Sequence, residues 1–167
     1  ASLIGHAMSI RMYAWLLSAD EKYLASARTS GRFLAERQDP SGGWHHDAGY
    51  SLDAAQCVME GFCTYERLSR DRSFHETFVR AADRMITGTV TPEGAPLIGN
   101  LTECGEYAHF AFLAWKQSGL ERHNKGGEAI LKNITDHFEA NDGYWGTAVQ
   151  PKSSAIIGPP KPCPNPH

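Results

Sequence analysis

The stretch Phe33-Leu34-Ala35-Glu36-Arg37-Gln38-Asp39-Pro40-Ser41-Gly42-Gly43-Trp44 decides the fold class of this chain. It is typical of the last turns of a helix, a stop made by Pro and Gly, and a Trp that closes the turn. A fainter copy, Phe138-Glu139-Ala140-Asn141-Asp142-Gly143-Tyr144-Trp145, follows about two 50-residue periods later. Because self-similarity at a fixed period marks repeat architectures, the two stretches predict an all-α helical repeat.

The composition is that of a globular protein with a single core. The chain has 167 residues, of which 41% are hydrophobic and 21% are charged. Its net charge of −3, with no two basic residues adjacent, argues against a nucleic-acid partner. No apolar segment approaches the roughly 20 residues that span a bilayer, so no membrane span is expected. The sequence indicates no cellular compartment.

Apolar residues at helical spacing predict the secondary structure. No segment alternates with the period of two that is typical of a half-buried strand. Ser18 and Glu21 have the spacing of a capping box at the start of the second helix. The pattern predicts six helices, at about residues 3–17, 21–37, 52–68, 74–86, 103–117 and 128–139.

The links between these helices alternate in length. Short links near 18–20, 69–73 and 118–122 alternate with long ones near 39–50, 87–101 and from 140 onward, which are rich in Gly and Pro. In an up-and-down array, all long links lie at one end, and loops on a rigid scaffold commonly carry function. We therefore expect three antiparallel helical hairpins whose long loops converge on one face.

The helices also differ in composition. The third and fifth are rich in small and aromatic residues, which suits an inner ring, whereas the second, fourth and sixth carry more charge, which suits a solvated outer face. The helical domain is expected to cover 1–148, followed by an extended Pro-rich tail over 149–167. With no CxxC pair, three of the cysteines are expected to be small buried residues and the one in the tail to be exposed: Cys57, Cys63, Cys104 and Cys163.

The opening stretch resembles the QW motif of the triterpene cyclases, which belong to the α/α-toroid superfamily. Phe33-Leu34, Gln38, Gly42 and Trp44 carry that likeness, and the segment 15–24 is similar to a common turn of the carbohydrate-active toroids. The resemblance implies three antiparallel hairpins forming a partial α/α-toroid. It also implies a structural role for the motif, with Gln binding backbone at a helix end and Trp stacking on it.

The same superfamily includes six-hairpin glycosidases, polysaccharide lyases, sugar epimerases and isoprenoid cyclases. The acidic and magnesium motifs of the terpene cyclases, the prenyltransferase zinc pattern and the lanthionine cyclase Cys-His-Gly are all absent. An isoprenoid cyclase fragment is therefore the weakest of the possible functions. A full toroid needs about five to seven hairpins, so we expect an open half-toroid, a piece of a longer protein, or one part of an assembly.

The first candidate site lies in the loop that follows Trp44. His45, His46, Asp47, Tyr50 and the nearby Asp53 have the side chains that general acid–base catalysis uses, and a Tyr/His pair suits proton abstraction from a uronic acid. The alternative is structural. In it the histidines are solvated, Asp47 forms a turn, and Asp53 complements a helix dipole.

The second candidate site lies at the start of the fifth predicted helix. Asn100, Glu103, Glu106 and His109 are spaced so that the helical members share a face. Paired with Asp47 or Asp53, Glu103 would make the two-carboxylate arrangement of a glycosidase. The alternative is an ordinary polar network at a helix start. Asn100 and His109 are assigned to substrate binding, together with three aromatic side chains that could stack on sugars: Trp44, Tyr144 and Trp145.

The leading functional hypothesis is a carbohydrate-active protein with a saccharide ligand, no cofactor and no metal. A metal site from His45, His46 and Cys104 or His109 is disfavoured because adjacent histidines project differently. The alternative function is a non-catalytic helical-repeat module for self-assembly or partner binding. The support for this alternative is a row of apolar residues on the first helix that need neighbours on two sides. A homo-oligomer or the remainder of a longer chain would supply those neighbours. The residues are Ile4, Met8, Met12, Trp15 and Leu16.

Overall fold

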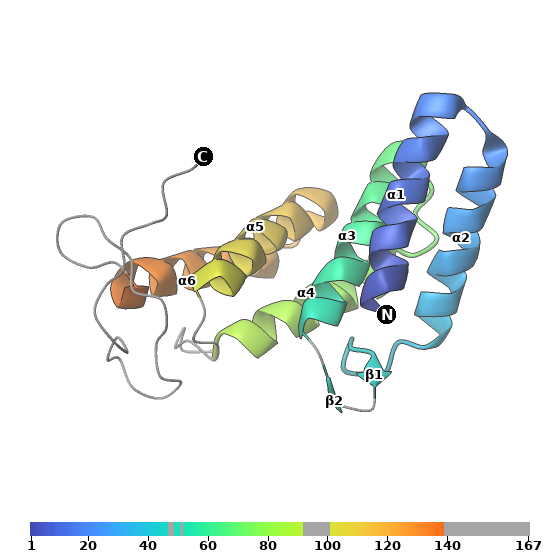
Figure 1. Ribbon diagram of the computed structural model, residues 1–167. Coiled ribbons are helices and arrows are strands. Elements are labelled where there is room, and N and C mark those ends of the chain that lie inside the picture. The colour runs from blue at the N-terminus through green and yellow to red at the C-terminus, as the bar shows by residue number, and fades with distance from the viewer. Residues whose placement is uncertain (47–48, 51, 92–100, 139–167) are drawn as a thin grey trace. The chain divides into compact units, whose positions relative to one another are not determined.

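The computed structural model describes residues 1–46, 49–50, 52–91 and 101–138. This part of the chain is helical, as predicted, and its only strands are two residues long each (Figure 1). The elements are α1 (Ser2–Ser18), α2 (Glu21–Glu36), β1 (His45–His46), β2 (Gly49–Tyr50), α3 (Leu52–Ser69), α4 (His75–Thr89), α5 (Leu101–Ser118) and α6 (Glu121–Phe138).

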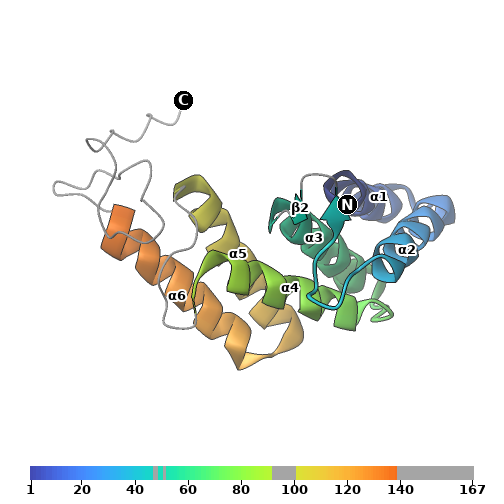
Figure 2. The ribbon, with the colours of Figure 1, turned by 90° about the horizontal axis from the view of Figure 1, so that it is seen from below.

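Within the described residues, the chain forms two compact units, one of 1–85 with 116–119 and the other of 86–115 with 120–138. In the first unit, α1 and α3 run in one direction and α2 runs in the other (Figure 1). Seen along the helices, α1, α2 and α3 form a cluster, with α1 packed against both of the others (Figure 2). The short α1–α2 link therefore lies at one end of this unit, and the long link that contains the β1–β2 ribbon lies at the other.

Glycines bring α1 and α3 into close backbone contact. A Cβ atom on Gly5 would lie 2.4 Å from the carbonyl oxygen of Cys57, and one on Gly61 would lie 2.7 Å from the carbonyl oxygen of Gly5. Met8 and Met12 on α1 fill the space beside this crossing and are fully buried. Small residues on both helices therefore allow α1 and α3 to approach closely.

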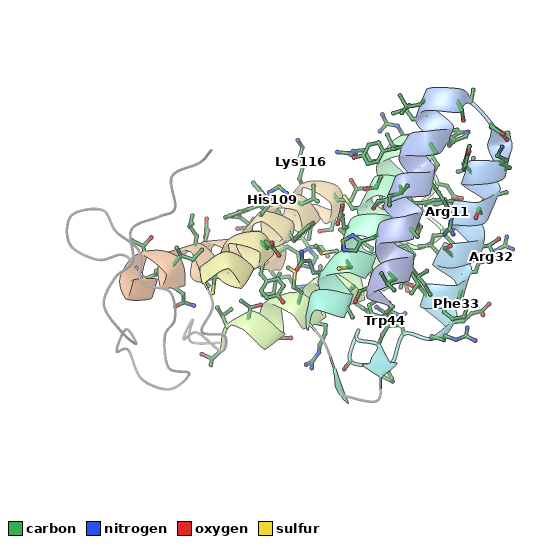
Figure 3. All side chains as sticks on the ribbon, in the orientation of Figure 1. Arg11, Arg32, Phe33, Trp44, His109 and Lys116 are labelled. Atoms are coloured by element: carbon green, nitrogen blue, oxygen red, sulfur yellow. The ribbon has the colours of Figure 1, made fainter. Side chains whose placement is uncertain are left out.

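The outer surface of α2 is charged, as predicted. Ala27, Gly31 and Leu34 face the core, and Gly31 lies so close to Phe74 that a Cβ atom would meet its ring at 2.4 Å. Arg32 projects away from α1 (Figure 3). The exposed charged residues of this helix and its end are Glu21, Lys22, Arg28, Arg32, Glu36 and Arg37.

The predicted capping box at the start of α2 is wrong. Asp20 is the N-cap, and its Oδ1 accepts a hydrogen bond from the backbone N–H of Lys22 at 3.0 Å. Ser18 instead donates to the carbonyl oxygen of Ala14 at 2.7 Å. A left-handed residue, Ala19, ends α1 with φ 54° and leaves a two-residue link, so Asp20 is the side chain that reaches the first free N–H groups.

In the second unit, the predicted start of the last helix is wrong by seven residues, because α6 begins at Glu121 rather than near 128. Gly126 and Gly127, which directly precede the predicted start, lie inside the helix. A Cβ atom on Gly126 would meet Ile86 at 2.6 Å, and one on Gly127 would meet Phe112 at 2.9 Å. Close packing on these two side chains outweighs the low helix propensity of glycine.

Candidate functional site

A turn after α2 holds the end of this helix and positions the ribbon that follows. Asp39 Oδ1 accepts hydrogen bonds from the backbone N–H and the hydroxyl of Ser41, and the N–H of Gly42 donates to the Asp39 carbonyl oxygen at 2.9 Å. Gly42 has φ 86°, and a Cβ atom there would lie 2.2 Å from the carbonyl oxygen of Arg80. Only glycine combines that left-handed backbone with such a close approach.

Gln38 connects this turn to α4. Its Nε2 donates to the carbonyl oxygen of Gly42 at 3.0 Å and to that of Thr77 at 2.9 Å, and its Oε1 accepts from Nε of Arg80 at 2.8 Å. One side chain thus fixes a loop carbonyl, a helix carbonyl and a guanidinium. This is the backbone-binding role that the resemblance implies for the glutamine.

Trp44 completes what we call the clasp, formed by Gln38, Gly42 and Trp44. Its indole N–H donates to the carbonyl oxygen of Leu34 at 2.8 Å, and the residue is only 4% exposed (Figure 3). This burial favours the structural role of Trp44, because a sugar-stacking ring needs an open face. Its assignment to substrate binding stays a prediction.

The clasp leads directly into the ribbon. There β1 pairs with β2 in antiparallel register, with His45 opposite Tyr50 and His46 opposite Gly49. Three predicted catalytic residues therefore stand on one short hairpin, and Asp53 follows as the second residue of α3. Asp47 lies outside the described residues, and so do the side chains of His45, His46, Tyr50 and Asp53.

The second predicted group lies on α5. Glu103 is its third residue, and Glu106 and His109 are exposed one turn apart, as their spacing predicts. Asn100, Tyr144 and Trp145 lie outside the described residues. The ribbon and the first part of α5 belong to different units, so a cleft that combines both groups stays a prediction.

No sequence pattern indicates the contact between a thiol and an imidazole that the structure shows. Sγ of Cys57 on α3 lies 3.1 Å from Nε2 of His6 on α1, and Nδ1 of His6 lies 3.6 Å from Oε2 of Glu60. The order thiol, imidazole, carboxylate is that of a nucleophile, a base and a residue that orients the base. Cys57 is buried, however, and lies in the middle of a helix, so the described structure offers a substrate no route to the sulfur. Because 51 residues separate Cys57 from His6, no local motif could reveal this contact.

A buried carboxylate was also missed. The Glu66 side chain is fully buried, and its Oε2 accepts hydrogen bonds from Nε2 of Gln117 and pairs with Nδ1 of His75, each at 3.0 Å. Within the part of the chain that the structure describes, Oε1 of Glu66 has no hydrogen-bond partner. Three helices thus meet at one acidic side chain, which serves as a polar anchor inside the unit.

Asp71 and Cys63 have displaced pKa values. Hydrogen bonds from Ser73, then from Tyr65, lower the pKa of Asp71 to about 2. This carboxylate joins the α3–α4 link to α2, because its Oδ2 also accepts from Arg28 at 3.3 Å. Burial raises the pKa of the Cys63 thiol to about 11. Cys57, Cys63 and Cys104 are buried, as predicted.

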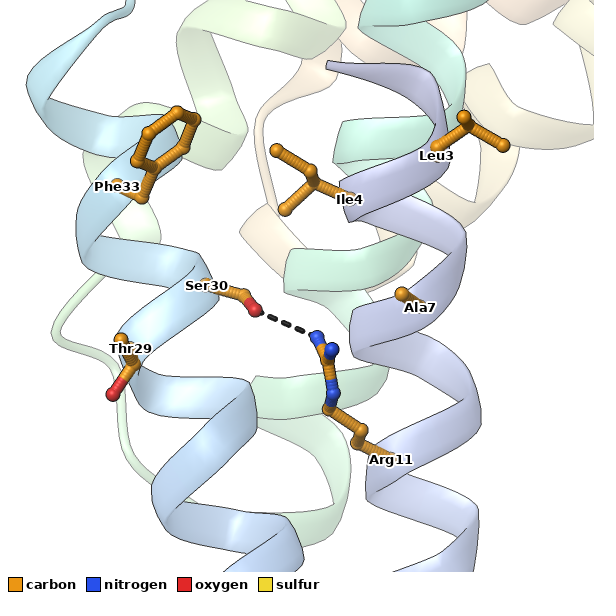
Figure 4. Close-up of a pocket in the computed structure, with 7 residues that line it drawn as sticks. All are labelled: Leu3, Ile4, Ala7, Arg11, Thr29, Ser30 and Phe33. Carbon is orange, nitrogen blue, oxygen red and sulfur yellow. Dashed lines mark hydrogen bonds between the residues drawn. The ribbon is translucent and has the colours of Figure 1, made fainter.

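A groove of about 310 Å³ runs between α1 and α2 (Figure 4). Ile4 and Phe33 face each other across it, and Nη1 of Arg11 donates to the hydroxyl of Ser30 at 2.8 Å. No carboxylate among the described residues pairs with Arg11. The groove therefore offers an apolar wall and one guanidinium to an anionic group, although it is open to solvent.

Comparisons with known proteins give this chain no family. No protein-family model matches it, and no curated protein matches it either. Among residues 1–46, 49–50, 52–91 and 101–138, no cluster of three or more His, Cys, Asp and Glu is arranged to hold a metal ion. None of the described helices has the length and the apolar character that crossing a bilayer requires.

Proposed function

We propose that this chain is a carbohydrate-active protein of the glycosidase, lyase or epimerase type. Its three hairpins would form a partial α/α-toroid, and its saccharide would bind at the end where the long links lie. The observation that carries this proposal is the clasp. It fixes a short ribbon with His45, His46 and Tyr50 immediately before the start of α3. A rigid helical scaffold that presents acid–base residues on a short hairpin is a common way to build an active site.

The residue types suit two reactions on sugars. A histidine with a tyrosine can remove a proton from the carbon beside a uronic acid carboxylate and return one to the ring or to the leaving oxygen. Two carboxylates, Glu103 with Asp47 or Asp53, can instead act as acid and base in glycoside hydrolysis. Asn100, His109, Tyr144 and Trp145 would then orient the sugar.

A panel of neutral and uronic-acid oligosaccharides tests the proposal. Hydrolysis is detected from the new reducing ends, and β-elimination from the ultraviolet absorbance of the new double bond. Epimerisation is detected from proton exchange in deuterated water. We expect one substrate class to react, and Tyr50→Phe or His45→Ala to lower kcat by about 10²–10⁴-fold. The control is Arg32→Ala, on the exposed side of α2. Failure of every saccharide to bind or react would contradict the proposal.

A second candidate function is a non-catalytic module for self-assembly or partner binding. The observation that favours it is the exposure of large apolar residues on α1, because Leu3 is 85% and Leu17 is 87% exposed. Exposed apolar side chains that gather into a patch commonly mark an interface. The two candidate functions are compatible if the assembled protein still presents the ribbon to a saccharide.

A further inference from the structure

The exposed apolar residues of α1 form a regular row. Leu3, Ile10 and Leu17, which we call the outer stripe, are 85%, 68% and 87% exposed and are spaced seven residues apart. Ala7 and Ala14, which are half-buried, lie between them at alternating intervals of four and three. This is the spacing of a helix seam that packs along another helix, with small residues between large ones.

The outer stripe differs from the row that the sequence predicted to need cover. Met8 and Met12 are fully buried, Ile4 and Trp15 are half-buried, and only Leu16 of that set is exposed. Those inward residues are covered by α2 and α3. Because α1 is apolar on the opposite side as well, it has the character of a helix with neighbours on both sides.

Two polar pairs flank the outer stripe where α1 meets α3. Near its start, His6 Nδ1 lies 3.6 Å from Oε2 of Glu60. Nearer its end, Nη2 of Arg67 donates to the hydroxyl of Tyr13 at 3.0 Å. Glu60 and Arg67 are seven residues apart, so they lie on one side of α3 about 10 Å from each other. The flank is therefore acidic toward one end of α1 and basic toward the other.

We propose that the outer stripe is the interface of a two-fold dimer in which α1 packs antiparallel against α1 of a second copy. A two-fold axis perpendicular to α1, passing near Ile10, brings Leu3 opposite the second copy's Leu17. The same rotation places the α3 flanks of both copies on one side of the interface, and the two flanks run in opposite directions. Each Glu60 then faces the second copy's Arg67, twice by symmetry.

The charge pattern selects this occupant and this direction. A parallel pairing would place the α3 flank of one copy beside the α2 side of the other, so Glu60 and Arg67 would not meet. In the antiparallel pairing, the same surface supplies both partners of each ion pair, which is the self-complementarity that an isologous interface needs. The seam along α1 is about 25 Å long, enough for several layers of side chains.

This inference rests on the second candidate function and is independent of saccharide chemistry. Sedimentation equilibrium of the 167-residue chain tests it, and we expect a dimer at micromolar concentration. Ile10→Glu places two carboxylates at the axis and should weaken association at least about a hundredfold. The matched control is Leu131→Glu, at a 49% exposed apolar position on α6, which should leave the dimer intact. Circular dichroism melts confirm that each variant folds.

Charge reversal tests the direction of packing. Glu60→Arg alone and Arg67→Glu alone each bring like charges together, and each should weaken the dimer about tenfold. The double reversal should restore most of the affinity. A wild-type monomer throughout the micromolar range would overturn the proposal. So would a dimer broken by Leu131→Glu but not by Ile10→Glu, or a double reversal no tighter than the two single ones. A dimer that forms through another face would overturn this interface but not the second candidate function. Saccharide assays test only the ribbon, so the first candidate function is tested separately.

Discussion

The clasp holds one large apolar side chain, Trp44, and the outer stripe holds three, and the structure treats them in opposite ways. Trp44 in the clasp is 4% exposed and has its indole N–H bonded to Leu34, whereas Leu17 on the outer stripe is 87% exposed. The clasp is complete within one chain. The outer stripe has no cover among the residues that the structure describes. The comparison teaches that a large apolar side chain stabilises the fold where its own chain covers it, and remains available for association where its own chain does not.

The largest effect is expected in the clasp. Trp44→Ala removes a buried aromatic ring and leaves a cavity, so the free energy of unfolding should fall by about 3–5 kcal/mol. Denaturant unfolding measured by circular dichroism gives this value. Stability like that of the wild type would show that the clasp and the outer stripe do not differ in the way described.

The close contact between α1 and α3 gives the next effect. Gly5→Ala would place a Cβ atom 2.4 Å from a backbone oxygen that cannot easily move, so it should cost about 1–3 kcal/mol. Gly105→Ala is the matched control, because outside its own helical backbone and chain neighbours no described atom lies within 4 Å of the new Cβ. It should raise stability by up to about 1 kcal/mol through helix propensity. Equal effects at both glycines would argue against the tight crossing.

A smaller effect depends on pH. The pKa of Asp71 is about 2 in the folded chain, below that of an unfolded Asp, so the unfolded state takes up a proton first. The stabilisation from Asp71 is present above about pH 4 and is lost as the pH falls toward 2. Asp71→Asn should lower stability near pH 7 by about 1 kcal/mol after solvent screening and flatten the acid dependence. Unfolding midpoints measured between pH 2 and 7 check this, and unchanged midpoints would contradict it.

The smallest effect on folding is expected at the outer stripe. Leu17→Ser removes an apolar side chain that is already in water, so the stability of the monomer should change by less than about 0.5 kcal/mol. Thermal melts at low protein concentration, where any dimer dissociates, make this measurement. A loss as large as that at Trp44 would mean that Leu17 is covered within one chain.

Much of the fold could be predicted because it depends on local patterns. Gln38, Gly42 and Trp44 mark the end of α2 by their spacing, and the charges of α2 show its outer side. The start of α6 could not be predicted, since Gly126 and Gly127 are helical only because Ile86 and Phe112 pack on them. For the candidate site, spacing correctly indicated that Glu106 and His109 lie one turn apart. The contact of His6 with Cys57 depends on two helices meeting, which no local spacing encodes.

Disulfide trapping tests the central claim about the outer stripe most directly. In a Cys163→Ser background, Ile10→Cys should cross-link to itself, and Leu3→Cys should cross-link to Leu17→Cys of another copy, because antiparallel packing brings those positions within disulfide reach. Leu131→Cys supplies the rate of random collision. The account predicts that the self-linked Ile10→Cys and the mixed Leu3→Cys with Leu17→Cys form much faster than this control. Rates no faster than the control, or Leu3→Cys linking to itself as fast as to Leu17→Cys, would contradict it.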